Sequence, residues 1–172
     1  MNGLRELGDQ LKEKLGIEKR VVRAMPNTPA LVGEGMTAAC ANDAVTEEEK
    51  EYALKILRSF GKVEIVAENM IDAVVAVSGS APAYVFMFIE AMADAAVSEG
   101  MPRKQAYEFA AQAVYGSAKM VLDTGKHPGE LKDMVCSPAG TTIEAVRVLE
   151  EKGLRSAVIE AMKVCADKSR KM

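Results

Sequence analysis

The sequence has no tryptophan, a single histidine and three cysteines among its 172 residues. The cysteines (Cys40, Cys136 and Cys165) are scattered without CxxC spacing, which argues against a structural zinc site and against a disulfide framework. We therefore expect no metal site, and reduced thiols fit a cytoplasmic protein. Aromatic residues make up only 5% of the chain, whereas alanine and methionine are plentiful, so the composition favours helix.

An excess of basic charge is also missing. Asp and Glu number 25 against 22 Lys and Arg, a formal net charge of -3. Such a balance leaves no electrostatic footprint for nucleic acid. The first twenty residues contain no apolar signal-peptide core, because they include Arg5, Glu6, Asp9, Lys12 and Glu13.

The most apolar stretch runs from Ala81 to Val97. It is slightly short for a membrane span and contains Glu90 and Asp94, whose charges are costly in hydrocarbon. We interpret it as a buried helix of a soluble protein and expect no membrane association.

Residues 1–67 are predicted to form a partial α/β domain. An amphipathic helix is expected over Leu4–Leu15, and short strands over Arg20–Met25, Met36–Ala41 and Lys62–Val66. Thr46 and Glu49 have capping-box spacing, so a helix should begin there and run to Phe60. Strand, helix and strand in this order are typical of the end of a Rossmann-type α/β domain.

Residues 68–172 are predicted to be entirely helical, which makes the chain mainly α. The expected segments are helices over Asp72–Val77, Ala83–Ser98, Pro102–Asp123, Ile143–Glu150 and Leu154–Lys168, with a break at Ser78–Pro82 and a turn at His127–Met134. The helix from Ala83 is apolar around nearly its whole circumference and must be covered on all sides. One copy offers too few helices for that, which favours a homodimer over a monomeric bundle.

The segment best suited to bind a ligand is the small-residue loop Ser137–Thr142, which leads into a helix N-terminus. Thr141 and Glu144 have capping-box spacing there. Free backbone N–H groups and the helix dipole make such an end suitable for a carboxylate. A capped helix without any ligand remains the alternative.

Three runs of residues extend this interpretation. Pro128–Ala145 (PGELKDMVCSPAGTTIEA), Arg20–Pro29 (RVVRAMPNTP) and Ser78–Tyr84 (SGSAPAY) resemble segments of the pyrroline-5-carboxylate reductases. The resemblance extends from about Lys19 to the C-terminus. It implies an oxidoreductase of proline biosynthesis that reduces 1-pyrroline-5-carboxylate to L-proline with NADPH or NADH, and a helical domain that forms a homodimer.

The resemblance also implies site residues. The Ala24–Met25–Pro26 backbone would lie against the nicotinamide, with Asn27 close by. The substrate carboxylate would be held by backbone N–H groups of the loop, at Ser137, Gly140, Thr141 and Thr142. The Thr142 hydroxyl would hydrogen-bond the ring nitrogen of the cyclic imine. Such a reaction needs orientation more than acid–base catalysis, and His127 fits a helix start better than a catalyst.

One departure from the family concerns the cofactor. A dinucleotide fold needs a strand, GxGxxG and a helix within about thirty residues, but only twenty residues precede Val21. Gly33-Glu34-Gly35 comes too late and lacks the third glycine. We therefore expect the phosphate-binding half of the cofactor site to be absent and catalysis by this chain to be impaired.

Two other functions are alternatives to the reductase. A helical dimerisation module would keep the fold but catalyse no reaction. A β-hydroxyacid dehydrogenase would carry an Asn-x-x-x-Lys pair on the long helix, but Ser80–Ser98 contains neither Asn nor Lys. The choice between NADPH and NADH and the oligomer size beyond a dimer stay open at this point.

Overall fold

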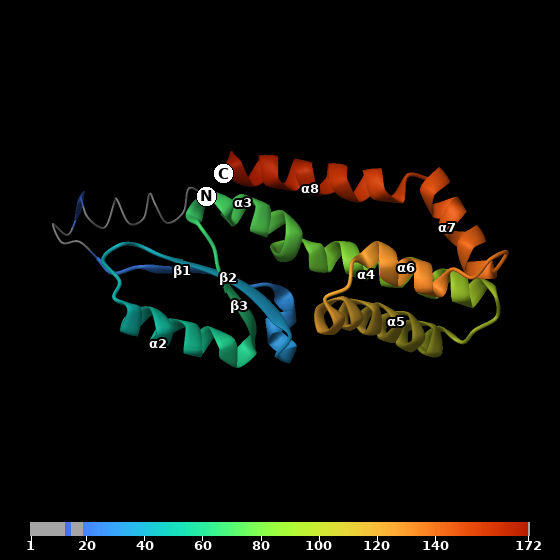
Figure 1. Ribbon diagram of the computed structural model, residues 1–172, viewed down its shortest axis with the longest axis horizontal. Helices are drawn as coiled ribbons and strands as arrows, with labels where there is room; N and C mark the ends of the chain where they lie inside the picture. Colours follow the sequence, from blue (N-terminus) through green and yellow to red (C-terminus); the bar gives the residue numbers. More distant parts are fainter. Residues whose placement is uncertain (1–12, 15–18, 172) are drawn as a thin grey trace. The chain divides into compact units, whose positions relative to one another are not determined.

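The computed structural model describes residues 13–14 and 19–171 (Figure 1). The prediction of a helix over Leu4–Leu15 lies outside these residues, apart from Glu13 and Lys14, which are helical. The strands are β1 (Val22–Met25), β2 (Gly35–Ala41) and β3 (Gly61–Ile65). The α-helices are α2 (Glu47–Leu57), α3 (Ile71–Val74), α4 (Ala81–Ser98), α5 (Arg103–Thr124), α6 (Pro128–Val135), α7 (Thr141–Glu151) and α8 (Leu154–Arg170). All three predicted strands are confirmed, and no strand follows residue 70 among the described residues.

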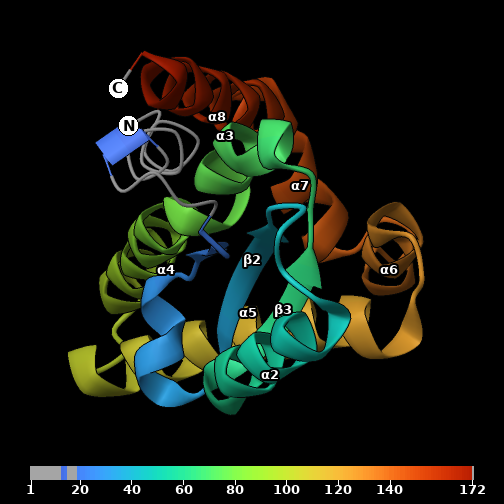
Figure 2. The same ribbon diagram turned by 90° about the vertical axis from the view of Figure 1, so that its left-hand side faces the viewer.

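The three strands form one sheet in the order β1-β2-β3. β1 is antiparallel to β2, with Ala24 opposite Ala39, and β2 is parallel to β3, with Thr37 opposite Val63. Helix α2 makes the crossover between the parallel strands and covers one face of the sheet (Figures 1 and 2). Beneath α2, the buried side chains of the sheet lie in the middle of β2, and Leu54 of α2 is only 1% exposed.

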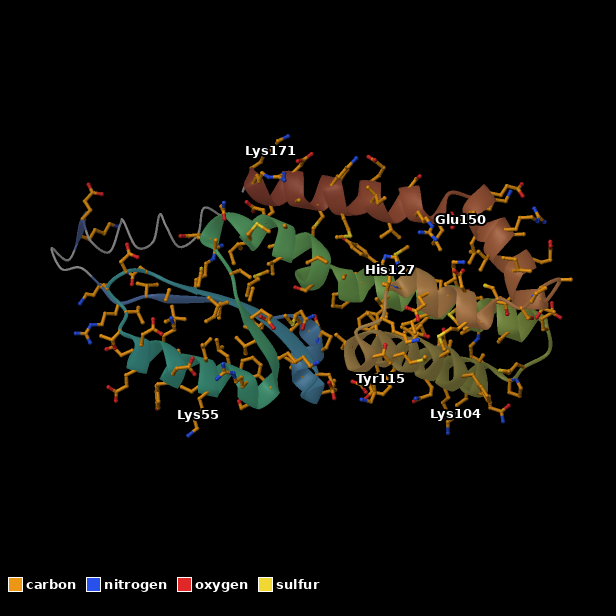
Figure 3. The ribbon with its side chains drawn as sticks, in the orientation of Figure 1. Lys55, Lys104, Tyr115, His127, Glu150 and Lys171 are labelled. Atoms are coloured by element: carbon orange, nitrogen blue, oxygen red, sulfur yellow. The ribbon has the colours of Figure 1, made fainter. Side chains whose placement is uncertain are left out.

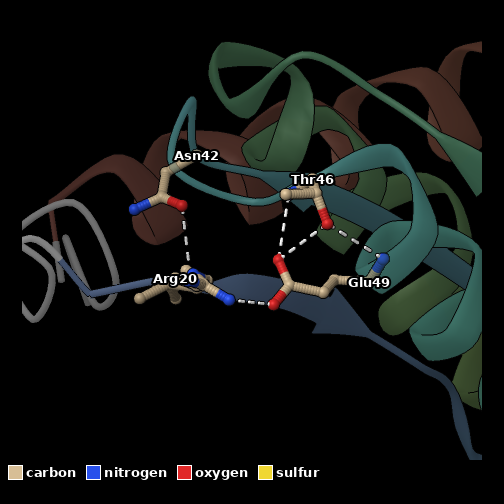
Figure 4. Close-up of polar contacts among 5 residues, drawn as sticks. Arg20, Asn42, Thr46 and Glu49 are labelled. Carbon is tan, nitrogen blue, oxygen red and sulfur yellow. Dashed lines mark hydrogen bonds and ion pairs between the residues drawn. The ribbon is translucent and has the colours of Figure 1, made fainter.

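The N-terminus of α2 is fixed by the predicted capping box (Figure 4). The Thr46 hydroxyl accepts a hydrogen bond from the Glu49 backbone N–H (3.3 Å), and Glu49 Oε2 accepts one from the Thr46 N–H (3.0 Å). Arg20 forms an ion pair with the same carboxylate. Beside it, Asn42 Oδ1 accepts a hydrogen bond from the Val21 N–H (3.1 Å). The approach to β1 is thus tied both to α2 and to the end of β2.

The predicted break at Ser78–Pro82 is instead a widened helical turn. Val75–Gly79 forms a π-helix between α3 and α4, in which the Ser80 N–H donates to the Val75 carbonyl at 2.8 Å. Serine and glycine disfavour an α-helix, but the wider turn accommodates them without an interruption of the chain direction.

The chain divides into two compact units, residues 1–82 with 160–172 and residues 83–159, and each is described by itself. In the first unit, the C-terminal part of α8 lies beside α3 (Figure 1). Ser169 Oγ donates to Asp72 Oδ1 at 2.6 Å, and Cys165 Sγ donates to Ser80 Oγ at 3.2 Å. These bonds bring the end of the sequence onto the helical segment that follows the sheet.

The second unit contains most of α4, all of α5, α6 and α7, and the start of α8. The turn predicted at His127–Met134 is wrong, because Pro128–Val135 is the helix α6. His127 is its N-cap, and its Nδ1 accepts a hydrogen bond from the Gly129 N–H at 3.1 Å (Figure 3). Pro128 at the first helical position starts the helix rather than preventing it. The assignment of His127 to a helix start is confirmed.

Helix α4 is largely exposed in the single chain, contrary to the prediction that it is buried. Ala93 is fully buried, but large apolar side chains on α4 are exposed, namely Val85, Phe86, Met87 and Phe88. By length and composition alone, one helical stretch among the described residues, Glu68–Ser98, could cross a membrane. The exposure agrees with the expectation that one copy cannot cover this helix.

Candidate functional site

The predicted cofactor-facing residues lie together where β1 ends. Ala24 and Met25 pair with Ala39 and Ala38 of β2, which fixes their register, and Pro26 ends the strand because it cannot donate to the ladder. Ala24 and Pro26 are exposed, whereas Met25 is half-buried. This leaves two exposed apolar residues, Ala24 and Pro26, at the carboxyl end of β1.

Asn27, the fourth residue of this set, is bonded within the protein. Its Nδ2 donates to the Ser78 carbonyl at 3.1 Å, and its Oδ1 accepts from the Met36 N–H at 2.9 Å. The side chain therefore ties the end of β1 to the start of β2 and to the π-helix. The resemblance placed Asn27 near a cofactor but gave no sign of these contacts, because Ser78 is 51 residues away in the sequence.

A charged pair lies in the same sheet, and the sequence analysis missed it. Arg23 forms an ion pair with Glu68 at 3.3 Å and pairs in register with Cys40. Burial raises the pKa of the Cys40 thiol; the Glu68 carboxylate adds to that effect and the Arg23 guanidinium opposes it. The thiol is therefore protonated at neutral pH, and this cysteine is not an activated nucleophile.

The predicted substrate residues lie in the loop between α6 and α7 (Ser137 and Gly140) and in the first turn of α7 (Thr141 and Thr142). The Gly140 N–H donates to the Ser137 carbonyl at 3.0 Å, which closes a turn around Pro138 and Ala139. Ala139 has a φ of 55°, a left-handed conformation that costs a non-glycine residue roughly 1–2 kcal/mol. Such strain is concentrated at functional loops.

Gly140 is required by the turn itself. A Cβ at this position would lie 2.3 Å from Ser137 Oγ and 3.1 Å from the Ser137 carbonyl oxygen. The small residue lets the loop fold back onto its own start. Ser137 and Thr141 are exposed, while Gly140 and Thr142 are half-buried.

The predicted capping box of Thr141 and Glu144 is wrong. The N-cap of α7 is Gly140, which places Thr141 inside the first turn, and no side chain of the described residues caps this helix. Glu144 instead accepts a hydrogen bond from Arg147 Nε at 3.1 Å. The first backbone N–H groups of α7 therefore have no capping side chain, an arrangement that suits an anion better than a capped end would.

The structure thus gathers four predicted residues at the end of β1 and the other four around the start of α7, two in the loop before it and two in its first turn. The two groups belong to different compact units. Among the described residues, no group of three or more His, Cys, Asp or Glu side chains is placed to hold a metal ion.

Comparison with known protein families gives a match over the helical region. The model of the family described as pyrroline-5-carboxylate reductase dimerisation matches residues 68–172. Among curated proteins, the chain is 68% identical over 164 residues to the pyrroline-5-carboxylate reductase of Escherichia coli, which covers 95% of this chain and 61% of that protein. It is 50% identical over 153 residues to the enzyme of Methanosarcina acetivorans, covering 89% of this chain and 57% of that protein.

Solved structures give the same family. A pyrroline carboxylate reductase of Plasmodium falciparum with NADP bound has a TM-score of 0.87 and 36% identity, over 95% of this chain and 66% of that one. A pyrroline-5-carboxylate reductase of Coxiella burnetii has a TM-score of 0.88 and 38% identity, over 95% and 61% respectively. The chain therefore spans less than two thirds of the length of these relatives.

Proposed function

The chain belongs to the pyrroline-5-carboxylate reductase dimerisation family, and from this premise we propose that it contributes the substrate-binding part of an enzyme that forms L-proline. The reaction would be the reduction of 1-pyrroline-5-carboxylate by NADPH or NADH. The observation that carries the proposal is the start of α7, where backbone N–H groups follow a strained, glycine-dependent turn and lack a capping side chain.

The substrate would be held by its carboxylate at the α7 N-terminus. The backbone N–H groups of Thr141 and Thr142, together with the positive end of the helix dipole, favour a negative charge there, whereas Gly140 contributes the turn in which its own N–H is bonded. Ser137 shapes the turn through its carbonyl, which accepts from Gly140. The Thr142 hydroxyl, half-buried next to these groups, would bind the ring nitrogen and orient the C=N bond.

The cofactor would lie against Ala24, Met25 and Pro26. Ala24 and Pro26 are exposed, and their small apolar side chains suit one face of a nicotinamide ring; Asn27 follows them directly in the chain. When bound, the nicotinamide supplies the hydride that reduces the C=N carbon, and the bonding pair of the double bond passes to the ring nitrogen, which is protonated beforehand. The protein would contribute placement and would move no proton itself.

A homodimer would cover the exposed apolar side chains of the helical unit. Phe86 and Met87 on α4 and Phe109 and Leu122 on α5 are each at least 59% exposed in the single chain. Monomeric proteins rarely leave apolar surface on this scale open to water. The family match supports dimerisation through residues 68–172 and a division into an α/β part (1–67) and a helical part (68–172).

A cytoplasmic location completes the proposal. All three cysteines are free thiols, which fits a reducing compartment.

A dimerisation module without catalysis is the second candidate, favoured by the dimerisation family model that matches residues 68–172. An assay of the purified chain with 1-pyrroline-5-carboxylate and NADPH separates the two. Formation of L-proline with matching NADPH oxidation supports the enzyme, whereas a dimer that forms no proline supports the module. A stable monomer that forms no proline contradicts both.

A further inference from the structure

The Ser78 carbonyl lacks the donor that a regular helix would give it. Ser78 lies in the π-helix just before α4. An α-helix would give its carbonyl the N–H four residues later, but that residue is Pro82, which has no N–H. Pro82 lies in the first turn of α4, where the missing N–H costs that helix little. The missing N–H instead leaves the Ser78 carbonyl without its α-helical donor.

Asn27 Nδ2 supplies the missing donor from another part of the chain. It lies 3.1 Å from the Ser78 carbonyl, and the Asn27 Oδ1 holds the Met36 N–H at 2.9 Å. Each polar atom of the carboxamide thus has a backbone partner, one in the π-helix and one at the start of β2. A carboxamide is needed here, because the side chain must donate on one side and accept on the other.

The end of β1 also packs against the same π-helix. A Cβ placed on Gly79 would lie 3.2 Å from the Met25 Cε, so the methionine side chain rests on the bare glycine. Met25 and Asn27 therefore fix both sides of Pro26, which is an exposed residue.

We propose that Asn27 is a positioning residue for the nicotinamide and does not bind it. This inference rests on the proposed function, because it assumes that the Ala24–Pro26 backbone meets the cofactor. The Asn27 side chain would hold that backbone in place by donating to the Ser78 carbonyl, which receives no hydrogen bond from Pro82. A ligand contact from the same amide would require one of its two backbone bonds to be shared or broken.

The test uses variants of the whole chain. Asn27→Asp keeps the acceptor for Met36 but removes the donor to Ser78, and Asn27→Ala removes both. Pro82→Ala restores an N–H four residues after Ser78, so combining it with Asn27→Ala forms a double-mutant cycle. Ser169→Ala is the matched control, because it breaks a hydrogen bond of 2.6 Å in the same unit and away from β1.

Two readouts are measured on every variant: the fluorescence of NADPH on titration with protein, and hydrogen exchange of the Met36 amide. We expect Asn27→Ala and Asn27→Asp to weaken NADPH binding by roughly three- to tenfold, the size of one or two backbone hydrogen bonds. Exchange at Met36 should rise in Asn27→Ala. Pro82→Ala should lessen the effect of Asn27→Ala on binding, and Ser169→Ala should change neither readout.

Three results would overturn the inference, and they point to different errors. If Asn27→Ala binds NADPH as tightly as the original chain, the residue positions nothing. If Asn27→Ala weakens binding equally with and without Pro82→Ala and Met36 exchange is unchanged, Asn27 contacts the cofactor directly. If the original chain does not bind NADPH, the cofactor part of the proposed function fails, and any rise in Met36 exchange reports a purely structural bond.

Discussion

A Cβ atom placed on Gly61 would lie only 2.1 Å from the Gly35 carbonyl oxygen, because the first residues of β2 and β3 are paired in register. Gly61 also has a φ of 148°, which L side chains rarely adopt. The sheet therefore depends on glycine at the point where the chain leaves α2 and enters β3. In the sequence, Gly35 was considered only as part of Gly33-Glu34-Gly35, and no local pattern indicates its approach to Gly61.

Gly61→Ala should disrupt the sheet. Overpacking and backbone strain each cost about 1–3 kcal/mol, and both apply here. Gly33→Ala is the matched control, since Gly33 has a positive φ of 79° but a Cβ placed on it would have no atom within 4 Å; it should cost only about 1–2 kcal/mol. Urea unfolding followed by circular dichroism measures both, and equal midpoints would contradict the close approach.

Thr37→Val should stabilise the protein by about 1 kcal/mol. Thr37 is completely buried in β2, and its hydroxyl has no hydrogen-bond partner among the described residues. Valine keeps the shape, removes the unsatisfied group and favours a strand. Thr28→Val, at an exposed position, should stay within about 0.5 kcal/mol of the original chain. A loss of stability in Thr37→Val would mean that the hydroxyl is bonded.

The contribution of the Glu49 charge should depend on pH. A hydrogen bond from the Thr46 backbone, and then one from Arg20, lower the pKa of the Glu49 carboxyl below its ordinary value of 4.5. A lowered pKa in the folded state means that the stabilisation is present above 4.5 and is lost as the pH falls through the folded pKa. Glu49→Gln keeps the capping geometry without the charge.

The urea midpoint of the original chain should therefore exceed that of Glu49→Gln at neutral pH, and the difference should shrink at pH values well below the ordinary carboxyl pKa of 4.5. A difference that is constant across the range would show that the carboxylate charge plays no part.

Substitution of the exposed apolar face of α4 should break the proposed dimer. Phe86→Asp and Met87→Asp place a charge where a second copy would be packed, so sedimentation should shift from dimer to monomer at micromolar concentration. Tyr52→Asp makes a similar change at a side chain of α2 that is 70% exposed, and it should leave the dimer intact. A stable monomer in the original chain would contradict the proposal.

Features set by neighbouring residues were predictable from the sequence, and those set by distant ones were not. The Thr46 and Glu49 box is confirmed because both partners lie within one turn. The same spacing at Thr141 and Glu144 gave a wrong prediction of a capping box, because the tight turn at Ala139 makes Gly140 the N-cap instead. The bond from Asn27 to Ser78 spans 51 residues, so no local pattern announces it.

In the helical region, too, local features were predictable and those that depend on distant contacts were not. Apart from α6, its helices follow from hydrophobic periodicity, and the start and end of α4 were predicted within two residues. Burial was not predictable, because an all-apolar helix indicates that something covers it without indicating that the cover comes from the same chain.

L-proline is the ligand that tests the assignment of the Ser137–Thr142 segment to the substrate. Its carboxylate should bind the N-terminus of α7, and its charged ring nitrogen should donate to the Thr142 hydroxyl. A hydrogen bond to a charged group is worth about 1.5–3 kcal/mol, so Thr142→Ala should weaken binding by more than about tenfold. Thr141→Ala is the control, because Thr141 lies in the same turn, is exposed and does not cap the helix.

The decisive measurement is a calorimetric titration of L-proline into the original chain and both variants, with the melting temperature of each. We predict that the original chain and Thr141→Ala bind L-proline, that Thr142→Ala binds it much more weakly, and that all three have similar melting temperatures. Equal affinity for Thr142→Ala and the original chain, with a lower melting temperature in the variant, would make Thr142 a structural residue and contradict the assignment of this loop to the substrate.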